Sequence, residues 1–501
     1  MVTERGTKEH SETVRSMVAR WVITGTITLE SAAHFGGENE GFSDMKILRD
    51  PKDGGPLLPG TSLAGALRSY LADVLGGYRS EEIDEVATLF GMVRKRPNEN
   101  NSESDNGAQA EEGPQSPLIV FDSLGRLLPE LNVEIRDGVA IDPKIGTAEH
   151  HKKYDFEVLP AGTEFPVRVE LIVGKGDNEI RLVSLLVKAL NGLCDGEIAL
   201  GMKRSRGLGA IKTDVWKALR FDLTTPEGWM QWLTSDHEKP TESTDGACSP
   251  TDAVRNTCSE FMIQTIAVDN RERVVIDTLL HVEGDLLIRS AGIEPAGADV
   301  IHLRSAGEPV LPGTSLAGAM RTQALKIANL FNRDALVDEI FGPRIKTNDN
   351  AMVENGNNSP KASKVRISEG KLSKAEARRQ IRIAIDRFTG GVVNGALFDE
   401  EVQSGGGVEV KIELRNPEKA EVGLLLLLLK DLLSGQIPVG GSVSVGRGIL
   451  KGKAKIRFKD GEVYDDIPAD LKVSKEIEDK FDDYIKSFTD TSKLTGEEVG
   501  A

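Results

Sequence analysis

Two acidic loops lie at matching distances from a motif that the chain repeats. Asp44 and Asp299 are each followed, five residues later, by an arginine. A carboxylate can hold a hard divalent cation through its oxygens, or it can accept a proton from a hydroxyl group. On the residues alone, either chemistry is open to both aspartates. The alternative is that each aspartate only shapes a turn, which is its commoner role in a glycine-rich loop.

The repeated motif is a Pro-Gly turn followed by an apolar helical pattern. Residues 58–68 read LPGTSLAGALR and residues 311–321 read LPGTSLAGAMR, so ten of the eleven positions are identical. A match of this length indicates two copies of one domain. Free N–H groups at the start of such a helix can bind a phosphate, although an ordinary capped helix explains the pattern equally well. The candidate RNA-binding residues of the motif are Gly60, Thr61, Ser62, Arg68, Gly313, Thr314, Ser315 and Arg321.

Each copy also has a glycine-rich loop between an apolar helix and a strand. The first loop carries three cations, and the second keeps the glycine spacing with one arginine. Glycines allow backbone N–H groups to approach phosphate oxygens closely, and cations beside them supply countercharge. The alternative is a tight turn that only needs positive φ angles. The candidates are Lys203, Arg204, Arg206, Gly207, Gly209, Gly446, Arg447 and Gly448.

Length, charge and cysteine content limit the possible functions. The chain has 501 residues, which is about two domains. A net charge of −17 argues against binding nucleic acid over the whole surface, so any polyanion must meet local basic patches. Three cysteines form neither a disulfide framework nor a zinc motif. The amino terminus lacks the apolar stretch of a signal peptide, and no apolar run is long enough to span a bilayer, so we expect a cytoplasmic protein without membrane contact.

Both copies predict the same order of elements. Hydrophobic periodicity predicts a first strand in each copy, with residues 23–32 aligned to 282–291, and then a helix and further strands. A second helix is expected over 180–193 in the first copy and over 422–433 in the second, each followed by a final strand. This order is the ferredoxin-like β-α-β-β-α-β arrangement of the α+β class, with two helices on one face of an antiparallel sheet.

Polar, non-periodic stretches at 98–115 and 347–363 predict flexible insertions within the two copies. Composition places the remaining boundaries. The expected segments are an N-terminal tail (1–15), a first domain (16–236), a linker rich in Thr, Ser, Asp and Pro (237–260), a second domain (261–471) and an acidic C-terminal tail (472–501). From residue 476 the tail is expected to start as a short amphipathic helix.

Taken together, these motifs resemble the RAMP superfamily. The shared pattern is a strand, an acidic loop, the Pro-Gly-Thr-Ser-Leu helix, a Phe-Gly pair, an Ile-Asp hairpin and a glycine loop before the last strand. More narrowly, the chain resembles tandem fusions of backbone subunits of type III CRISPR effector complexes of the subtype D branch. The resemblance covers about residues 16–220 and 275–460. One departure is that Ala64 and Ala317 stand where the family is often basic, which leaves the helix less charge to offer a phosphate.

The resemblance implies two tandem ferredoxin-like, or RRM-like, RAMP domains with inserted hairpins. It also implies antiviral defence in which CRISPR RNA, target RNA and other type III effector subunits are the partners. The aspartates at positions 44 and 299 would each cut target RNA with a transient divalent metal, Mg²⁺, by promoting attack of the neighbouring 2′-hydroxyl. The hairpins at 137–162 and 386–407 would be thumbs that wedge into the guide–target duplex. Their candidate residues are Ile145, Lys152, Arg387 and Phe388.

Two other functions are compatible with the same resemblance. In one, the aspartates are structural and the chain is a non-catalytic scaffold for CRISPR RNA. In the other, the protein is an endoribonuclease that processes precursor CRISPR RNA, which requires a histidine near the first strand. His34 is available, but the alignment pairs it with Ile293 in the second copy. The repeat itself predicts that Gly60 superposes on Gly313 and Gly207 on Gly446.

Overall fold

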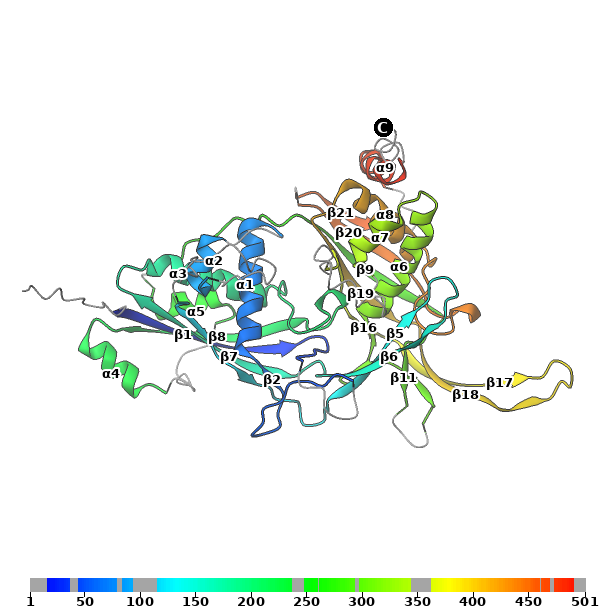
Figure 1. The fold of residues 1–501 in the computed structure, drawn as a ribbon, viewed down its shortest axis with the longest axis horizontal. Coiled ribbons are helices and arrows are strands. Elements are labelled where there is room, and N and C mark those ends of the chain that lie inside the picture. Colours follow the sequence, from blue (N-terminus) through cyan, green and yellow to red (C-terminus); the bar gives the residue numbers. More distant parts are fainter. Residues whose placement is uncertain are drawn as a thin grey trace, which may run out of the picture.

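The computed structural model describes ten stretches of the chain: 16–36, 44–78, 83–92, 115–236, 247–259, 261–292, 297–343, 362–459, 461–468 and 473–490. They form two α+β domains that follow one another along the sequence (Figure 1). The predicted insertions, the N-terminal tail and residues 491–501 lie almost entirely outside the described residues. Within the described stretches, no helix is both long enough and apolar enough to cross a membrane.

The first domain is built on a four-stranded antiparallel sheet. Along the sheet, the fourth strand of the repeat is followed by the first, the third and the second. This strand order confirms the ferredoxin-like prediction. The strands in that order are β8 (Ile211–Asp222), β1 (Met17–Leu29), β7 (Glu164–Gly174) and β3 (Leu118–Val120).

Helices cover one face of this sheet (Figure 1). Leu67 and Leu71 of the first helix are buried in the same core as Trp21 and Ile27 of the central strand. The Asn178 side chain caps the third helix by accepting a hydrogen bond from a backbone N–H of its first turn. The helices are α1 (Gly60–Gly76), α2 (Asp84–Phe90) and α3 (Glu179–Cys194).

The second domain repeats this strand order, with an added strand at one edge and three short strands that continue the same sheet from the third strand of the repeat. Helices again cover one face, and the last of them presents a nearly continuous run of buried leucines to the core. The strands are β20 (Ile449–Arg457), β9 (Arg273–Glu283), β19 (Gly407–Arg415), β15 (Val365–Ile367) and the edge strand β21 (Val463–Ile467). The helices are α6 (Gly313–Asn329), α7 (Asp334–Phe341) and α8 (Lys419–Leu433).

Below the helices, each domain extends a two-stranded ribbon (Figure 1). The ribbon of the first domain lies beneath the second domain, whereas the ribbon of the second domain projects away from the body. The ribbon strands are β5 (Glu134–Ile141) with β6 (Ala148–Val158), and β17 (Glu376–Ile385) with β18 (Val392–Ser404). Shorter strands complete the molecule: β2 (Leu57–Leu58), β4 (Ser123–Leu124), β10 (Asp285–Leu286), β11 (Arg289–Ala291), β12 (Val300–His302), β13 (Arg304–Ser305), β14 (Glu308–Leu311) and β16 (Gly370–Ser373).

Part of the predicted linker belongs to the first domain. Helix α5 (Pro250–Thr257) packs against β8 and buries Ala253 and Val254 in the first core, after another short helix, α4 (Pro226–Thr234), that also packs on β8. The sequence Ser-Pro-Thr-Asp had suggested a linker, but here Ser249 caps the helix and the proline occupies its first turn. Of the predicted linker, residues 237–246 and residue 260 lie outside the described structure.

The predicted acidic C-terminal tail also contains a packed helix. Helix α9 (Lys475–Thr489) lies against α8 and buries Phe481 and Phe488 in the second core. Its charged residues occupy the outward face, as the sequence pattern of a short amphipathic helix from residue 476 predicted.

The aligned start of the second copy was wrong by six residues. The Gly209 N–H donates to the carbonyl of Ala32, and the Gly448 N–H donates to the carbonyl of Asp285. Ala32 therefore corresponds to Asp285 and not to Ala291. Alternating β-branched strands fit one another in several registers, so only the contacts with the glycine loop reveal the true one.

Buried polar contacts join the two domains. Arg136 on β5 pairs with Glu369, which follows β15, and both side chains are at most 5% exposed. A second guanidinium hydrogen bond between them measures 3.1 Å. On another part of the junction, the Tyr78 hydroxyl donates to Glu413 at 2.9 Å. The Arg136–Glu369 contact buries one charge from each domain. Loss of either partner would leave the other charge buried and unpaired, which would weaken the junction.

Replacing Arg136 by Ala should destabilise the junction, because the Glu369 carboxylate would remain buried without its partner. Loss of one partner of a buried ion pair typically costs about 3–5 kcal/mol. Urea unfolding of the full chain, followed by circular dichroism, measures this change in the free energy of unfolding.

The matched control is Arg255→Ala, since Arg255 and Asp252 form an exposed pair of the kind that contributes about 0–1 kcal/mol. Replacing both Arg136 and Glu369 by Met should recover most of the stability. Equal unfolding free energies for Arg136→Ala and Arg255→Ala would mean that the buried pair does not hold the junction.

Candidate functional site

The acidic loop of the first domain meets the base of its ribbon. A parallel bridge joins Met45 to Phe156 on β6, which places Asp44 beside Asp155. The Asp44 N–H donates to Oδ1 of Asp155 at 2.9 Å, and the Asp155 N–H donates to Oδ2 of Asp44 at 3.0 Å. This reciprocal pair fixes two carboxylates side by side at the surface.

The second domain repeats the pairing with different electrostatics. β12 and β18 run parallel with Val300 opposite Glu400, so Asp299 lies opposite Asp399. The Arg379 guanidinium donates from Nε to both oxygens of Asp399, at 2.9 and 3.2 Å, and from Nη2 to the carbonyl of Gly297 at 3.3 Å. Arg379 holds the pKa of Asp399 below its usual range, and Asp399, with a smaller contribution from Asp299, raises the pKa of Arg379.

The spacing between aspartate and arginine has a structural origin. Arg49 reaches Glu157, the second residue after Asp155 on β6, at 3.5 Å. In the second domain Arg304 reaches Glu401, the second residue after Asp399, at 3.0 Å. Each arginine therefore ties its acidic loop to the ribbon beside the aspartate pair.

Two facing carboxylates fit a hard, weakly held cation better than a resident metal. Mg²⁺ is commonly bound by one or two carboxylates that are completed by water and substrate phosphates. Asp44 and Asp155 provide such an oxygen donor set. Across the described stretches of the chain, no cluster of three or more His, Cys, Asp or Glu side chains could enclose a metal.

The glycine loops of the two domains have the same backbone conformation. In each, a 3-10 turn is flanked by two left-handed residues: Lys203 and Gly207 in the first domain, Ser442 and Gly446 in the second. A Cβ at Gly209 would lie 1.8 Å from the Leu200 carbonyl oxygen. A Cβ at Gly448 would likewise lie 2.0 Å from the oxygen of Val439. The glycines are thus required by the turn itself, which is the non-binding alternative raised by the sequence.

The first glycine loop docks on the second domain. A Cβ at Gly207 would lie 2.3 Å from the backbone nitrogen of Glu369, and a Cβ at Gly313 would lie 2.5 Å from the carbonyl oxygen of Arg206. The Arg206 guanidinium donates to the carbonyl of Phe341 at 2.9 Å. The loop and the start of α6 therefore form one composite surface at the domain junction. Around Gly446, by contrast, a Cβ would meet nothing within 4 Å.

The cations of the first loop differ in their accessibility. The Lys203 ammonium donates to the Tyr154 hydroxyl at 2.7 Å and lies 3.7 Å from the centre of the Phe156 ring. Burial, with a smaller contribution from Arg136, lowers the pKa of Lys203 to about 8. Arg204 is exposed, whereas Arg206 is engaged at the junction. Arg204 is thus the cation of this loop that is best placed to meet a phosphate.

The Pro-Gly helices begin two residues earlier than a cap at Thr61 or Thr314 would require. Pro59 and Pro312 are the N-caps, and neither helix has a side-chain cap from Thr or Ser. The Gly60 N–H instead donates to Oδ1 of Asp122 at 2.7 Å, which places a carboxylate at the start of α1. That negative charge disfavours a phosphate at the same nitrogen. The hydroxyl-bearing residues Thr61, Ser62 and Thr314 are exposed beside these helix starts, and Ser315 is half-buried.

Three arginines predicted to bind RNA have structural roles. Arg68 donates to the carbonyl of Phe90 and Arg321 to the carbonyl of Gly342, so each stabilises the end of the short helix that closes with a Phe-Gly pair. Arg447 is buried and donates to Glu400 at 2.7 Å. We therefore do not retain these three as phosphate ligands. The sequence could not separate them from surface arginines, because their carbonyl and carboxylate partners are distant in the chain.

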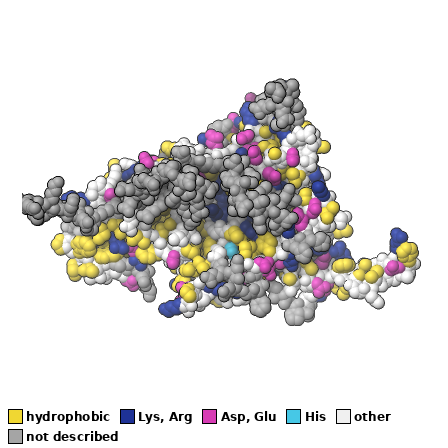
Figure 2. All heavy atoms as spheres, viewed as in Figure 1, with side chains coloured by type: hydrophobic (Ala, Val, Ile, Leu, Met, Phe, Trp, Pro, Cys, Tyr) yellow, Lys and Arg dark blue, Asp and Glu magenta, His cyan; other side chains and the backbone are white. Residues whose placement is uncertain are grey.

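The ribbons have the exposed tips that the thumb prediction requires. Ile145 is 70% exposed and Phe388 is 82% exposed, and the Arg387 guanidinium lies 4.6 Å from the centre of the Phe388 ring. In Figure 2, hydrophobic and basic side chains gather at the end of the projecting β17–β18 ribbon. Lys152 pairs with Glu149 at 2.6 Å, so its charge is partly neutralised.

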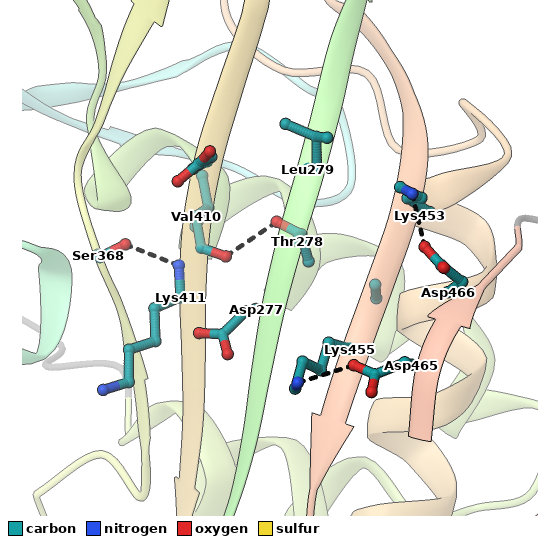
Figure 3. A pocket seen from close by; sticks show the side chains of 12 residues that line it. Asp277, Thr278, Leu279, Ser368, Val410, Lys411, Lys453, Lys455, Asp465 and Asp466 are labelled. Carbon is teal, nitrogen blue, oxygen red and sulfur yellow. Dashed lines mark hydrogen bonds and ion pairs between the residues drawn. The ribbon is translucent and has the colours of Figure 1, made fainter. Parts of the chain in front are cut away.

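A hollow of about 630 Å³ lies on the sheet face of the second domain, away from the acidic loops. Figure 3 shows that cations and carboxylates line it in pairs: Lys453 with Asp466, and Lys455 with Asp465 at 2.8 Å. Because these charges compensate one another, the hollow has no net preference for an anion.

The sequence analysis missed Asp155 and Asp399, and it did not reveal that Arg379 contacts Asp399. A pattern that could have revealed the aspartates is an aromatic residue followed by Asp, any residue and Glu, which occurs as YDFE at 154–157 and as FDEE at 398–401. Arg379 has no comparable pattern, since its counterpart in the first copy is not basic.

Comparison with known proteins agrees with this duplicated geometry. The sequence profile of the RAMP superfamily matches residues 26–212 and again residues 280–451. A curated relative, the CRISPR system Cms endoribonuclease Csm3 of Enterococcus italicus, is 32% identical over 88 residues, which are 16% of this chain and 41% of that protein. The match thus spans less than half of the relative. With two matched segments, two ferredoxin-like sheets and two equivalent glycine turns, this chain belongs to the RAMP superfamily as a tandem pair of its domains.

Proposed function

We propose that this chain is a backbone subunit of a type III CRISPR ribonucleoprotein that binds CRISPR RNA and cleaves the complementary target RNA in antiviral defence. The observation that carries the proposal is the pair of facing carboxylates, Asp44 and Asp155, at the base of an exposed ribbon. Membership of the RAMP superfamily and the similarity to an endoribonuclease of a CRISPR system support the same function.

The cleavage chemistry follows from the position of the carboxylates. The 2′-oxygen of the target nucleotide attacks the adjacent phosphorus, the bond from phosphorus to the 5′-oxygen breaks, and the products are a 2′,3′-cyclic phosphate and a 5′-hydroxyl. Asp44 accepts the 2′-hydroxyl proton, and the departing 5′-oxygen takes a proton from water. Asp155 holds Asp44 in position through its N–H. A bound Mg²⁺ would stabilise the charge that develops on the phosphate oxygens.

The guide RNA is best accommodated over the domain junction. There the first glycine loop carries the exposed Arg204, and the loop lies against the start of α6 through Arg206 and Gly313, beside the exposed Thr314. A cation beside a helix N-terminus is a favourable place for a phosphate. The ribbon β5–β6 lies beneath the same junction, where its exposed tip can approach a bound duplex.

Other type III effector subunits would complete the outer half-sites. Among the described residues, Gly60 at the start of α1 lies against Val120 and Phe121 of its own domain and not against a glycine loop, and a Cβ at Gly446 would meet nothing within 4 Å. Each of these two places therefore offers half of the composite surface found at the junction. This proposal makes the neighbouring subunits partners in RNA binding as well as in assembly.

Processing of precursor CRISPR RNA is disfavoured by the position of His34. This histidine is 2% exposed, and its Nδ1 lies 2.7 Å from the carbonyl oxygen of Glu157. Its structural counterpart in the second domain is Leu287, because Met202 and Gly441 donate equivalent hydrogen bonds to the carbonyls of His34 and Leu287. A buried, hydrogen-bonded imidazole cannot reach an RNA substrate.

In a reconstituted complex, Asp44→Asn should abolish cleavage at one target position while leaving target binding nearly unchanged. The amide keeps the shape of the side chain but cannot accept the 2′-hydroxyl proton, so the expected loss of rate is about 100-fold or more. Denaturing gel electrophoresis of end-labelled target RNA measures the cut, and filter binding measures affinity.

Two controls accompany this experiment. A target whose nucleotide 5′ of the scissile phosphate carries a 2′-deoxyribose should resist cleavage in the unmodified complex, because the nucleophile is missing. Asp142→Asn, at the turn of the β5–β6 ribbon, should leave the cut intact. If Asp44→Asn cuts as fast as the unmodified protein, the scaffold function replaces the nuclease function.

RNA affinity should fall between pH 7 and pH 9 if the Lys203 ammonium contacts a phosphate. Its pKa of about 8 means that the side chain is charged below this pH and neutral above it. Loss of one contact to single-stranded RNA should reduce the slope of log K against log salt by about 0.7. Titrations at constant ionic strength measure both quantities.

The Lys203→Arg variant should bind RNA with an affinity independent of pH over this range, since arginine stays protonated. Arg204→Ala should weaken binding equally at both pH values. A similar pH-dependent fall in Lys203→Arg would assign the effect to another group.

A further inference from the structure

The two aspartate pairs occupy equivalent places but carry different charge. In the first domain, Asp44 and Asp155 bond to each other's backbone. In the second, a guanidinium occupies both oxygens of Asp399 and also reaches the loop that carries Asp299. The formal charge of the group is therefore −2 in the first domain and −1 in the second, counting the two aspartates and the bound arginine.

Register identifies the residue that causes this difference. On β6, Glu157 pairs with Ile135 of β5, and on β18 the equivalent Glu401 pairs with Arg379 of β17. Ile135 and Arg379 are thus counterparts in the two ribbons. Ile135 is 60% exposed and has no charge to offer a carboxylate.

We propose that Arg379 silences the acidic pair of the second domain, so that only the Asp44–Asp155 pair accepts a divalent cation and supports cleavage. This inference rests on the proposed nuclease function and refines it. Arg379 acts as a positioning residue. Its guanidinium group occupies the oxygens of Asp399, so that they are not available to another cation, and it places a positive charge where a metal would lie. A guanidinium within a few ångströms repels a divalent ion, and its N–H groups compete with that ion for the carboxylate oxygens.

The anchoring of Arg379 explains why it stays in place without deep burial. Its side chain is 49% exposed, but it contacts a carboxylate on β18 and a backbone carbonyl at Gly297 together. A lysine at the same position could not make the two-oxygen contact, although it would keep the charge.

Ferrous ion provides a test that does not depend on RNA cleavage. Fe²⁺ bound in place of Mg²⁺ generates hydroxyl radicals with peroxide and ascorbate, and these cut the polypeptide next to the metal. In the purified full chain, we expect fragments from cuts near residues 44 and 155 and none near 299 and 399. Excess Mg²⁺ should suppress them.

Exchanging the two counterparts should exchange the behaviour of the sites. Arg379→Ile should raise cutting near Asp299 by about tenfold or more, because removal of one charge at close range strengthens cation binding by at least that factor. Ile135→Arg should lower cutting near Asp44 by a similar factor. Arg379→Lys should show little cutting near Asp299, since the positive charge at this position is retained.

The matched control is Arg378→Ile, which removes an exposed cation from the neighbouring position, whose side chain points to the other face of β17. It should leave the pattern unchanged. Equal cutting at both sites in the unmodified chain, or no gain in Arg379→Ile, would overturn the proposal.

RNA cleavage then separates the inference from the function on which it rests. Within a reconstituted complex, the unmodified chain should make one cut that depends on Asp44, and Arg379→Ile should add a second cut that depends on Asp299. If the ferrous pattern behaves as expected but no variant cuts RNA, the silencing by Arg379 stands and the nuclease function fails. If the unmodified chain already makes a cut that Asp299→Asn removes, the silencing is wrong and the nuclease function stands.

Discussion

The parallel pairing between each acidic loop and the second strand of its ribbon is the interaction on which the candidate site depends. It joins segments a hundred residues or more apart, with Met45 opposite Phe156 and Val300 opposite Glu400. A shift of one residue would turn every side chain of the strand to the opposite face and separate the aspartates. The ion pairs of Arg49 and Arg304 sit directly beside this pairing and keep the register.

The glycine loops impose a second constraint, which is steric. Gly209 and Gly448 lie so close to the carbonyls of Leu200 and Val439 that no side chain fits, and the turn before each needs left-handed residues. In the first domain the loop also contacts the second domain. Gly207 lies against the backbone just after β15, and Arg206 lies against the start of α6. The first glycine loop therefore packs within its own domain and also helps to position the second domain.

The two copies have diverged most where the ribbon meets the glycine loop. In the first domain this place is apolar, with Leu208 packed against Phe156. In the second, Arg447 stands in place of Leu208 and pairs with Glu400 and Gln380. Gln380 is the counterpart of Arg136. Gln380 bonds within its own domain, whereas Arg136 bonds across the junction to Glu369. A duplicated fold has thus become an asymmetric pair without any change in strand order.

The sequence by itself determined the duplication, the ferredoxin-like order, the positions of the main helices and both acidic loops, because exact repeats and hydrophobic periodicity are local properties. It did not determine the start of the second copy, since alternating strands fit several registers, nor helix α5, whose polar face dominates its composition. Tertiary structure alone decided which charged side chains are held by other parts of the protein. Arg68, Arg321 and Arg447 bond to carbonyl or carboxylate groups that lie 21 to 47 residues away, and Arg379 meets Asp399 only because two strands pair. Local sequence encodes the turn and the helix, but the partner of a side chain depends on how separate elements pack together.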